Sequence, residues 1–301
     1  MLRPGDTVRL VSPAGPPPPE AVKRGEELFT GWGLDVEYAP HALDSYGYLA
    51  APDADRLDDL NDALGDPSVR AVICTRGGYG VQHIVDGVDV QAVREDPKPV
   101  VGFSDITGLQ LWLWQHAGLA TVHGPMAAWR DDRTGPGSAE SLRAALLSTD
   151  QITVTRDPGQ PAADVEVPGT ASGTLLGGNV SLLAAAAGCR ELPGLRGAIV
   201  FLEDVGEAPY RLDRMLTQLR RSGAFDGVAG FALGQWTDCD GDPGTWTVSE
   251  MLHDRLGDLG VPILGGLPLG HGDGQLTIPL GVPATIDTTT GTLTAEPAVT
   301  A

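Results

Sequence analysis

Cysteine is scarce in this chain. Three of the 301 residues are cysteines, namely Cys74, Cys189 and Cys239, and they lie far apart with no CxxC spacing. An odd number of widely spaced cysteines fits neither a disulfide framework nor a zinc site. We therefore expect no bound metal, and the composition fits a reducing compartment such as the cytoplasm.

Lysine is scarcer still, and acidic residues dominate the charge. The only lysines are Lys23 and Lys98, and 40 acidic residues stand against 20 basic ones, which gives a formal net charge of −20. A chain with this charge repels polyanions, so a nucleic-acid partner is disfavoured. The acidic surface fits a salty habitat or a GC-rich genome, and the sequence does not separate these two explanations.

Long apolar runs are missing. No stretch approaches the ~20 residues that a membrane span needs. The first residues, MLRPGDTVRLVSPAG, lack the apolar core of a signal peptide. We therefore expect no membrane association. The hydrophobic content of 42% is that of a globular protein with an ample core.

The N-terminal half of the sequence alternates strand patterns with helix patterns. Strands are expected at 6–12, 34–39, 71–75, 99–103 and 119–123, and helices at 21–32, 54–64 and 106–116. This order predicts an α/β fold, with an N-terminal, mainly parallel sheet flanked by helices.

The segment 151–169 is rich in proline, aspartate and threonine. We interpret it as a linker between an N-terminal domain, residues 1–150, and a smaller C-terminal α/β domain, residues 170–301. In that second domain the patterns predict strands at 195–202 and 228–233, helices at 211–222 and 247–256, and a β-rich tail from residue 276.

Two features lie where expected strands of the first domain end. The turn Gly77-Gly78 follows one strand, and Ser104 stands between another strand and a helix. Sites in parallel sheets form at this edge. Ser104 or Asp105 fits a helix cap. The same arrangement resembles a nucleophile elbow, although Ile106 replaces the last glycine of GxSxG.

The sequence also contains candidates for a catalytic base and for an acid that orients it. His271 stands between glycines in LGHGDGQ, which suits a tight loop, although a lone histidine fits a surface turn equally well. Glu203 and Asp204 end an apolar strand. They fit a solvated or capping pair, a metal or phosphate site, or an acid that orients a histidine.

Taken together, the motifs resemble the LD-carboxypeptidase family of serine peptidases, which includes murein tetrapeptide carboxypeptidases and microcin C immunity peptidases. The motifs run in order along nearly the whole chain: SPAG, TRGGYG, VGFSDIT, HGPM, LLGGNVSLL, FLEDVGEAPYRLDRML, LGHGDGQ and IPLG. The resemblance implies two α/β domains with a site between them, a homodimer, and a Ser–Glu–His triad at Ser104, Glu203 and His271.

The triad implies further roles in an acyl-transfer reaction without a cofactor. The N–H groups of Asp105 and of Gly77 or Gly78 would form the oxyanion hole. Arg76 and Arg130 are the candidates for binding the free carboxylate of a peptide substrate.

Three functions stay open at this point. The first is a serine carboxypeptidase that releases D-alanine from a murein tetrapeptide, and the short region between Trp129 and Ser172 favours it. The second is a family member that cleaves a peptidyl-nucleotide antibiotic or a related amide. The third is a non-catalytic, nucleotide-binding α/β protein, which the lack of GxGxxG and GxxxxGK[ST] patterns disfavours.

Overall fold

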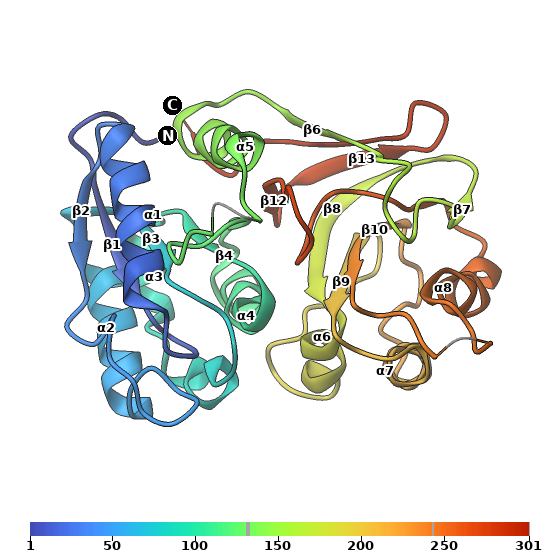
Figure 1. Cartoon of the computed structure of the whole chain (residues 1–301), viewed down its shortest axis with the longest axis horizontal. Helices are drawn as coiled ribbons and strands as arrows, with labels where there is room; N and C mark the ends of the chain where they lie inside the picture. Colours follow the sequence, from blue (N-terminus) through green and yellow to red (C-terminus); the bar gives the residue numbers. More distant parts are fainter. Residues whose placement is uncertain (131–132, 243, 301) are drawn as a thin grey trace.

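The computed structural model describes residues 1–130, 133–242 and 244–300. Two β-sheets stand side by side, each covered by helices, with α4 (Thr107–Ala117) between them (Figure 1). The α/β fold class predicted from the sequence is confirmed. Within the described ranges, no helix combines the length and the apolar character that crossing a bilayer requires.

The first sheet holds six strands among the described residues, in the order β12-β5-β4-β3-β1-β2. Neighbouring strands are parallel except for β12, which pairs antiparallel with β5. The strands are β1 (Thr7–Val11), β2 (Asp35–Tyr38), β3 (Val69–Cys74), β4 (Val100–Gly102), β5 (Thr121–His123) and β12 (Ile278–Leu280).

The second sheet holds eight strands among the described residues, in the order β6-β14-β13-β8-β9-β10-β11-β7. Its central strands β8 to β11 are parallel, and the outer ones are antiparallel. The strands are β6 (Ile152–Thr155), β7 (Glu166–Val167), β8 (Thr170–Asn179), β9 (Ile199–Val205), β10 (Gly230–Thr237), β11 (Ile263–Leu264), β13 (Pro283–Asp287) and β14 (Thr292–Ala295).

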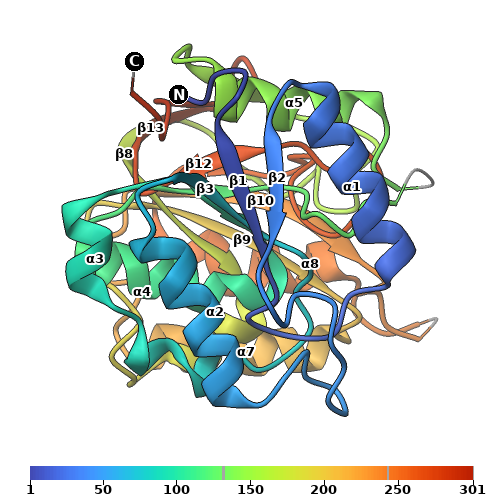
Figure 2. The ribbon, with the colours of Figure 1, turned by 90° about the vertical axis from the view of Figure 1, so that its left-hand side faces the viewer.

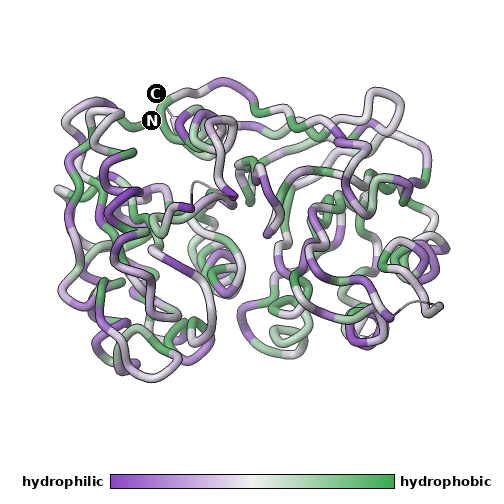
Figure 3. Tube along the Cα trace, in the orientation of Figure 1, coloured by the Kyte–Doolittle hydropathy of each residue, from purple (hydrophilic) through white to green (hydrophobic). Residues whose placement is uncertain are grey.

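Helices cover both faces of the first sheet, and further helices pack on the second. Besides α4 they are α1 (Pro19–Gly31), α2 (Asp53–Gly65), α3 (Val90–Glu95), α5 (Pro136–Leu147), α6 (Val180–Ala186), α7 (Pro209–Arg221) and α8 (Val248–Leu256), with short 3₁₀ turns η1 (Val81–His83), η2 (Val85–Gly87), η3 (Ser104–Ile106) and η4 (Gly257–Leu259). The helices α1, α5 and α7 begin with proline. Proline suits this position because an N–H in the first turn has no partner within the helix. Hydrophilic and apolar residues mix along α1 and α2, which lie at the outer edge of the molecule (Figures 2 and 3).

Helix α4 differs from the outer helices because it has no solvent-facing stripe over most of its length. Residues 107–113 are all buried, and a helix that is buried all round belongs to the interior. It packs against α3 on one side and against α6 and β8 on the other. The helix that follows Ser104 is therefore held from both halves of the molecule.

The predicted elements of the N-terminal half are confirmed to within a few residues at their ends. The sequence did not predict β8, a ten-residue strand. The segment 151–169, predicted to be a linker, contains β6 and β7, which pair within the second sheet. Strand β12, from the C-terminal part of the chain, joins the first sheet. The boundaries at residues 150 and 170 stay predictions.

Candidate active site

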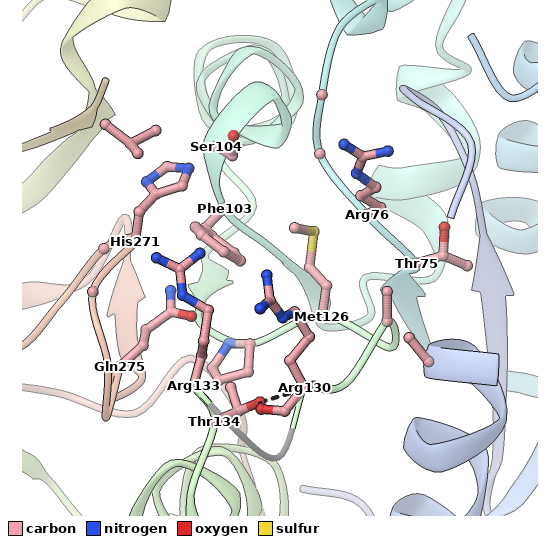
Figure 4. Close-up of a pocket in the computed structure, with 18 of the residues that line it drawn as sticks. Thr75, Arg76, Phe103, Ser104, Met126, Arg130, Arg133, Thr134, His271 and Gln275 are labelled. Carbon is pink, nitrogen blue, oxygen red and sulfur yellow. Dashed lines mark hydrogen bonds between the residues drawn. The ribbon is translucent and has the colours of Figure 1, made fainter. Parts of the chain in front are cut away.

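A cavity of about 480 Å³ opens at the carboxyl ends of β3, β4 and β5, the edge at which the sequence placed a site. Loops from both halves of the molecule line it (Figure 4). The lining residues are Pro18, Ala21, Thr75, Arg76, Gly77, Gly78, Phe103, Ser104, Pro125, Met126, Ala128, Arg130, Arg133, Thr134, Val205, Gly270, His271, Gly272 and Gln275. Both Ser104 and His271 line this cavity, as do Arg76, Arg130, Gly77 and Gly78.

Ser104 stands at the junction of β4 and α4 with a left-handed backbone, φ +64°. This conformation is costly for a residue other than glycine and is typical of functional turns. Neither Ser104 nor Asp105 caps α4, since that helix begins without a side-chain cap. The Asp105 carboxylate instead accepts a hydrogen bond from the Val81 N–H at 2.9 Å. Helix capping therefore does not explain the serine.

The glycine turn lies directly against Ser104. A Cβ added at Gly77 would lie 2.8 Å from the Ser104 Cβ and 3.0 Å from its Oγ, so only glycine fits there. Gly78 has φ +113°, and the Gly77 carbonyl accepts a hydrogen bond from the Gly15 N–H at 3.0 Å. Within the described chain, the N–H groups of Gly77, Gly78 and Asp105 donate to no other residue. These three donors remain available to a ligand.

Glu203 and His271 form a hydrogen-bonded pair. The His271 Nδ1 lies 2.6 Å from the Glu203 Oε2. Glu203 is completely buried on β9, whereas the His271 side chain keeps 13% of its exposure at the cavity. Gly270, with φ +134°, allows this approach, because a Cβ there would lie 2.8 Å from the same carboxylate oxygen. The loop thus brings the imidazole onto the acid, as its flanking glycines suggested.

The charge of Glu203 sets the protonation of His271. Burial by itself lowers the pKa of His271, but the Glu203 carboxylate beside the ring outweighs burial, so the pKa stands above its usual value. The hydrogen bond also fixes the tautomer, because Nδ1 donates its proton to Glu203 and leaves Nε2 as the acceptor when the ring is neutral.

Asp204, the acid next to Glu203, has a structural role. It accepts hydrogen bonds from the N–H and Oγ of Ser181 and from the Asn179 amide, at the start of α6. Burial, with a further contribution from the charge of Glu203, raises the pKa of Asp204 to about 6. Of the adjacent acids, only Glu203 is bonded to the histidine.

Three arginines line the cavity, one more than the sequence identified (Figure 4). Arg76 donates to the Pro16 carbonyl at 2.8 Å, which holds its guanidinium on one wall. Arg133, which sequence reasoning missed, lies 3.6 Å from the Asp273 carboxylate. Gln275 also lines the cavity and was not identified. Two arginines three residues apart, in a chain with 20 basic residues, were the signal that could have found Arg133.

A buried carboxylate, a histidine with a free Nε2 and a serine on a strained turn beside unpartnered N–H groups are the parts of a serine hydrolase site. Comparison with known proteins shows the family to which this hydrolase belongs. Residues 8–124 match the model of the LD-carboxypeptidase N-terminal domain, and residues 172–286 match that of its C-terminal domain. The chain belongs to the LD-carboxypeptidase family and is a serine-type carboxypeptidase, a hydrolase.

Individual relatives agree over nearly the whole chain. A putative carboxypeptidase of Streptomyces coelicolor is 47% identical over 98% of this chain and 94% of its own length. A murein tetrapeptide carboxypeptidase of Pseudomonas aeruginosa is 32% identical over 93% of this chain and 92% of its own. The structure of a microcin C7 self-immunity protein superposes with a TM-score of 0.88 at 23% identity, covering 98% of this chain and 97% of that one. The fold therefore does not separate the two substrate classes.

Proposed function

We propose that this protein hydrolyses the L,D-peptide bond of a murein tetrapeptide and releases the terminal D-alanine. The observation that carries the proposal is the Glu203–His271 hydrogen bond at the wall of a cavity that Ser104 also lines. The murein tetrapeptide carboxypeptidase of Pseudomonas aeruginosa, at 32% identity, supports the choice of substrate. Such a reaction fits the recycling of peptidoglycan in the cytoplasm.

In this mechanism Ser104 is the nucleophile and His271 is the base. The His271 Nε2 takes the proton of the Ser104 hydroxyl as its oxygen attacks the carbonyl before the D-alanine. His271 then gives that proton to the leaving amine, the C–N bond breaks, and D-alanine departs from an acyl-enzyme. Water, activated by the same ring, hydrolyses the ester and restores Ser104. Glu203 stabilises the imidazolium in each half of the reaction.

The negative charge on the tetrahedral oxygen needs donors. The N–H of Asp105, at the start of the turn before α4, and that of Gly77 or Gly78 would form the oxyanion hole. Each such donor is worth roughly 3 kcal/mol in the transition state where it has been measured in other enzymes. The close contact of Gly77 with Ser104 supports this assignment.

A carboxypeptidase must also bind the free carboxylate of its substrate. Arginine suits this because its planar fork donates two parallel hydrogen bonds to a carboxylate. We assign this role to Arg76 and Arg130, both at the cavity, with Arg133 as a further candidate.

The second candidate is cleavage of a peptidyl-nucleotide antibiotic. The observation in its favour is the fold that this chain shares with a microcin C7 self-immunity protein. The same catalytic groups would act on both substrates, so a direct assay has to separate them.

Mass spectrometry of L-Ala-γ-D-Glu-meso-diaminopimelate-D-Ala incubated with the protein tests the proposal. We expect release of D-alanine, unaffected by EDTA. A matched tetrapeptide that ends in L-alanine should show a kcat/KM lower by roughly tenfold or more, because its methyl group points the wrong way. Efficient turnover of an aminoacyl-sulfamoyl adenosine without tetrapeptide cleavage would instead support the second candidate.

A further inference from the structure

A second histidine lies close to the catalytic groups and has no role in the mechanism above. His123 ends β5, where it is paired with Gly102 on β4 and Ile278 on β12. It is completely buried, and neither of its ring nitrogens has a hydrogen-bond partner within the described residues. A buried imidazole without partners is costly, so its retention calls for a physical explanation.

The ring of His123 packs against two aromatic rings that adjoin the Glu203–His271 pair. It packs edge-on against Phe201, with ring centroids 4.9 Å apart, and Phe201 lies two residues before Glu203 on the same face of β9. It also packs against Phe103 at 5.9 Å, and Phe103 packs against His271 at 4.8 Å. One aromatic ring therefore separates the two imidazoles, and a single strand carries both Phe201 and Glu203.

Glu203 has a hydrogen-bond acceptor without a partner, which complements the N–H donor of His123. Its Oε2 is bonded to His271, but its Oε1 is buried and has no hydrogen-bond partner in the described chain. The Thr277 hydroxyl, which is also buried without a partner, lies beside the residue that follows His123, because a Cβ at Gly124 would lie 2.6 Å from it. A histidine, a carboxylate oxygen and a hydroxyl are the kind of partners that hold a buried water.

His123 acts in its neutral form. Burial is the main cause that lowers its pKa, to about 4, and the positive charge of His271 lowers it further, against the opposing charge of Glu203. A neutral imidazole carries one N–H donor and one acceptor. Since the ring lies inside the protein, that N–H is available to a buried acceptor and not to bulk solvent.

We propose that His123 is a positioning residue whose N–H donates, through one bound water, to the Oε1 of Glu203. The carboxylate is then held at both oxygens, by His271 on one side and by the water on the other. This fixes the plane of the carboxylate and therefore the direction in which the His271 Nε2 points. The inference rests on the proposed catalytic role of Glu203 and His271.

Removal of the His123 N–H donor changes the protonation of His271. Loss of the hydrogen bond to Oε1 leaves more negative charge on Glu203, which favours the protonated imidazole. The pKa of His271 should therefore rise in a variant that cannot donate. The other charged groups that act on His271 are Asp204 and Arg133, and neither changes in this variant.

The test compares His123→Leu with His123→Asn and His123→Gln. Leucine removes the donor, whereas the amides of asparagine and glutamine place an N–H near the former Nδ1 and Nε2. We expect His123→Leu to lower kcat by roughly tenfold, as loss of an orienting partner does elsewhere. NMR titration should show the pKa of His271 higher by about one unit. One of the two amide variants should restore most of the rate and the pKa.

Trp112→Phe is the matched control. The Trp112 ring is also buried and its N–H has no partner among the described residues, but it lies on α4, where it packs against His116. It should keep the wild-type rate and the wild-type pKa of His271.

Two outcomes would overturn the role of His123. One is a folded His123→Leu protein with unchanged kcat and an unchanged pKa of His271, as expected of a ring that only fills space. The other is failure of both amide variants to restore either readout. A wild-type protein that releases no D-alanine would instead contradict the proposed function, while the NMR titration would still test the contact with Glu203.

Discussion

The geometry of this site depends on a few residues with a positive φ or with no room for a side chain. Ser104 has a positive φ, and a side chain at Gly77 would clash with Ser104. Gly270 allows the loop to place His271 against a completely buried Glu203. The positive φ of Ser104 has an energetic cost, and such strain is typical of functional sites.

The Glu203–His271 pair predicts the pH dependence of catalysis. His271 must be neutral to act as a base, and its pKa is raised. In the wild type, kcat/KM should therefore be full above this pKa and should fall as the pH drops through it, at a pH above the ordinary ~6.5 of histidine.

The variant Glu203→Gln should change this profile in a definite direction. Without the carboxylate, burial dominates and lowers the pKa of His271, so the acidic limb should move to lower pH while kcat falls. The direction is opposite to that expected for His123→Leu. Measuring kcat/KM against pH for both variants checks the signs, and an acidic limb that stays in place in Glu203→Gln would show that Glu203 does not control His271.

Residue types at single positions were predictable from the sequence, but their surroundings were not. The strand before Ser104 and the glycines around His271 showed where each stands in the chain. The burial of Glu203 and the lack of a cap on α4 depend on packing, which local pattern does not contain. Arg133 and Gln275 were missed because nothing local marks a residue that reaches a cavity through a loop.

At the scale of elements, β8 contacts the first residue of α4, close to Ser104, the proposed nucleophile. A Cβ at Gly178, on β8, would lie 2.7 Å from the Thr107 Oγ1 and 2.8 Å from its Cγ2. The Asn179 N–H also donates to this Oγ1 at 3.2 Å. Strand β8 was not predicted because glycine is depleted in strands, whereas here the glycines allow close approach of a neighbouring helix.

We therefore expect Gly178→Ala to reduce both stability and turnover. The added methyl group meets two atoms of Thr107, so rotation of that side chain does not relieve the clash. The cost should be about 1–3 kcal/mol in unfolding free energy, and the displaced start of α4 should lower kcat.

Gly188→Ala is the control for backbone strain alone. Gly188 also has a positive φ, +93°, but nothing lies within 4 Å of its added Cβ. Its cost should be about 1 kcal/mol, with kcat unchanged. Denaturant unfolding and steady-state kinetics on both variants measure these effects, and equal kcat values in the two variants would show that this contact does not position Ser104.

At the scale of the whole molecule, the site is assembled from both sheets. Ser104 follows β4 of the first sheet, and Glu203 lies on β9 of the second. His271 lies in the loop between β11 and β12, which belong to different sheets. The sequence predicted the first, parallel sheet well, because its strands and helices alternate at short range. The crossing of β12 into the first sheet is a long-range contact, and local patterns do not encode it.

The charge at the cavity differs in sign from the charge of the whole chain. The protein carries a net charge of −20, yet arginines line the cavity. A substrate with a free carboxylate fits this arrangement, and nucleic acid remains disfavoured by the overall field. The homodimer that the family resemblance implied stays a prediction.

The most direct test of the central claim is kcat together with thermal melting for Ser104→Ala, His271→Ala and the double variant. If the two residues act as one proton-transfer unit, each single variant should lose a factor on the order of 10³ or more in kcat, and the double variant should be scarcely worse. The melting temperature of Ser104→Ala should not fall, because its hydroxyl caps no helix. A folded Ser104→Ala protein with full turnover would contradict the account.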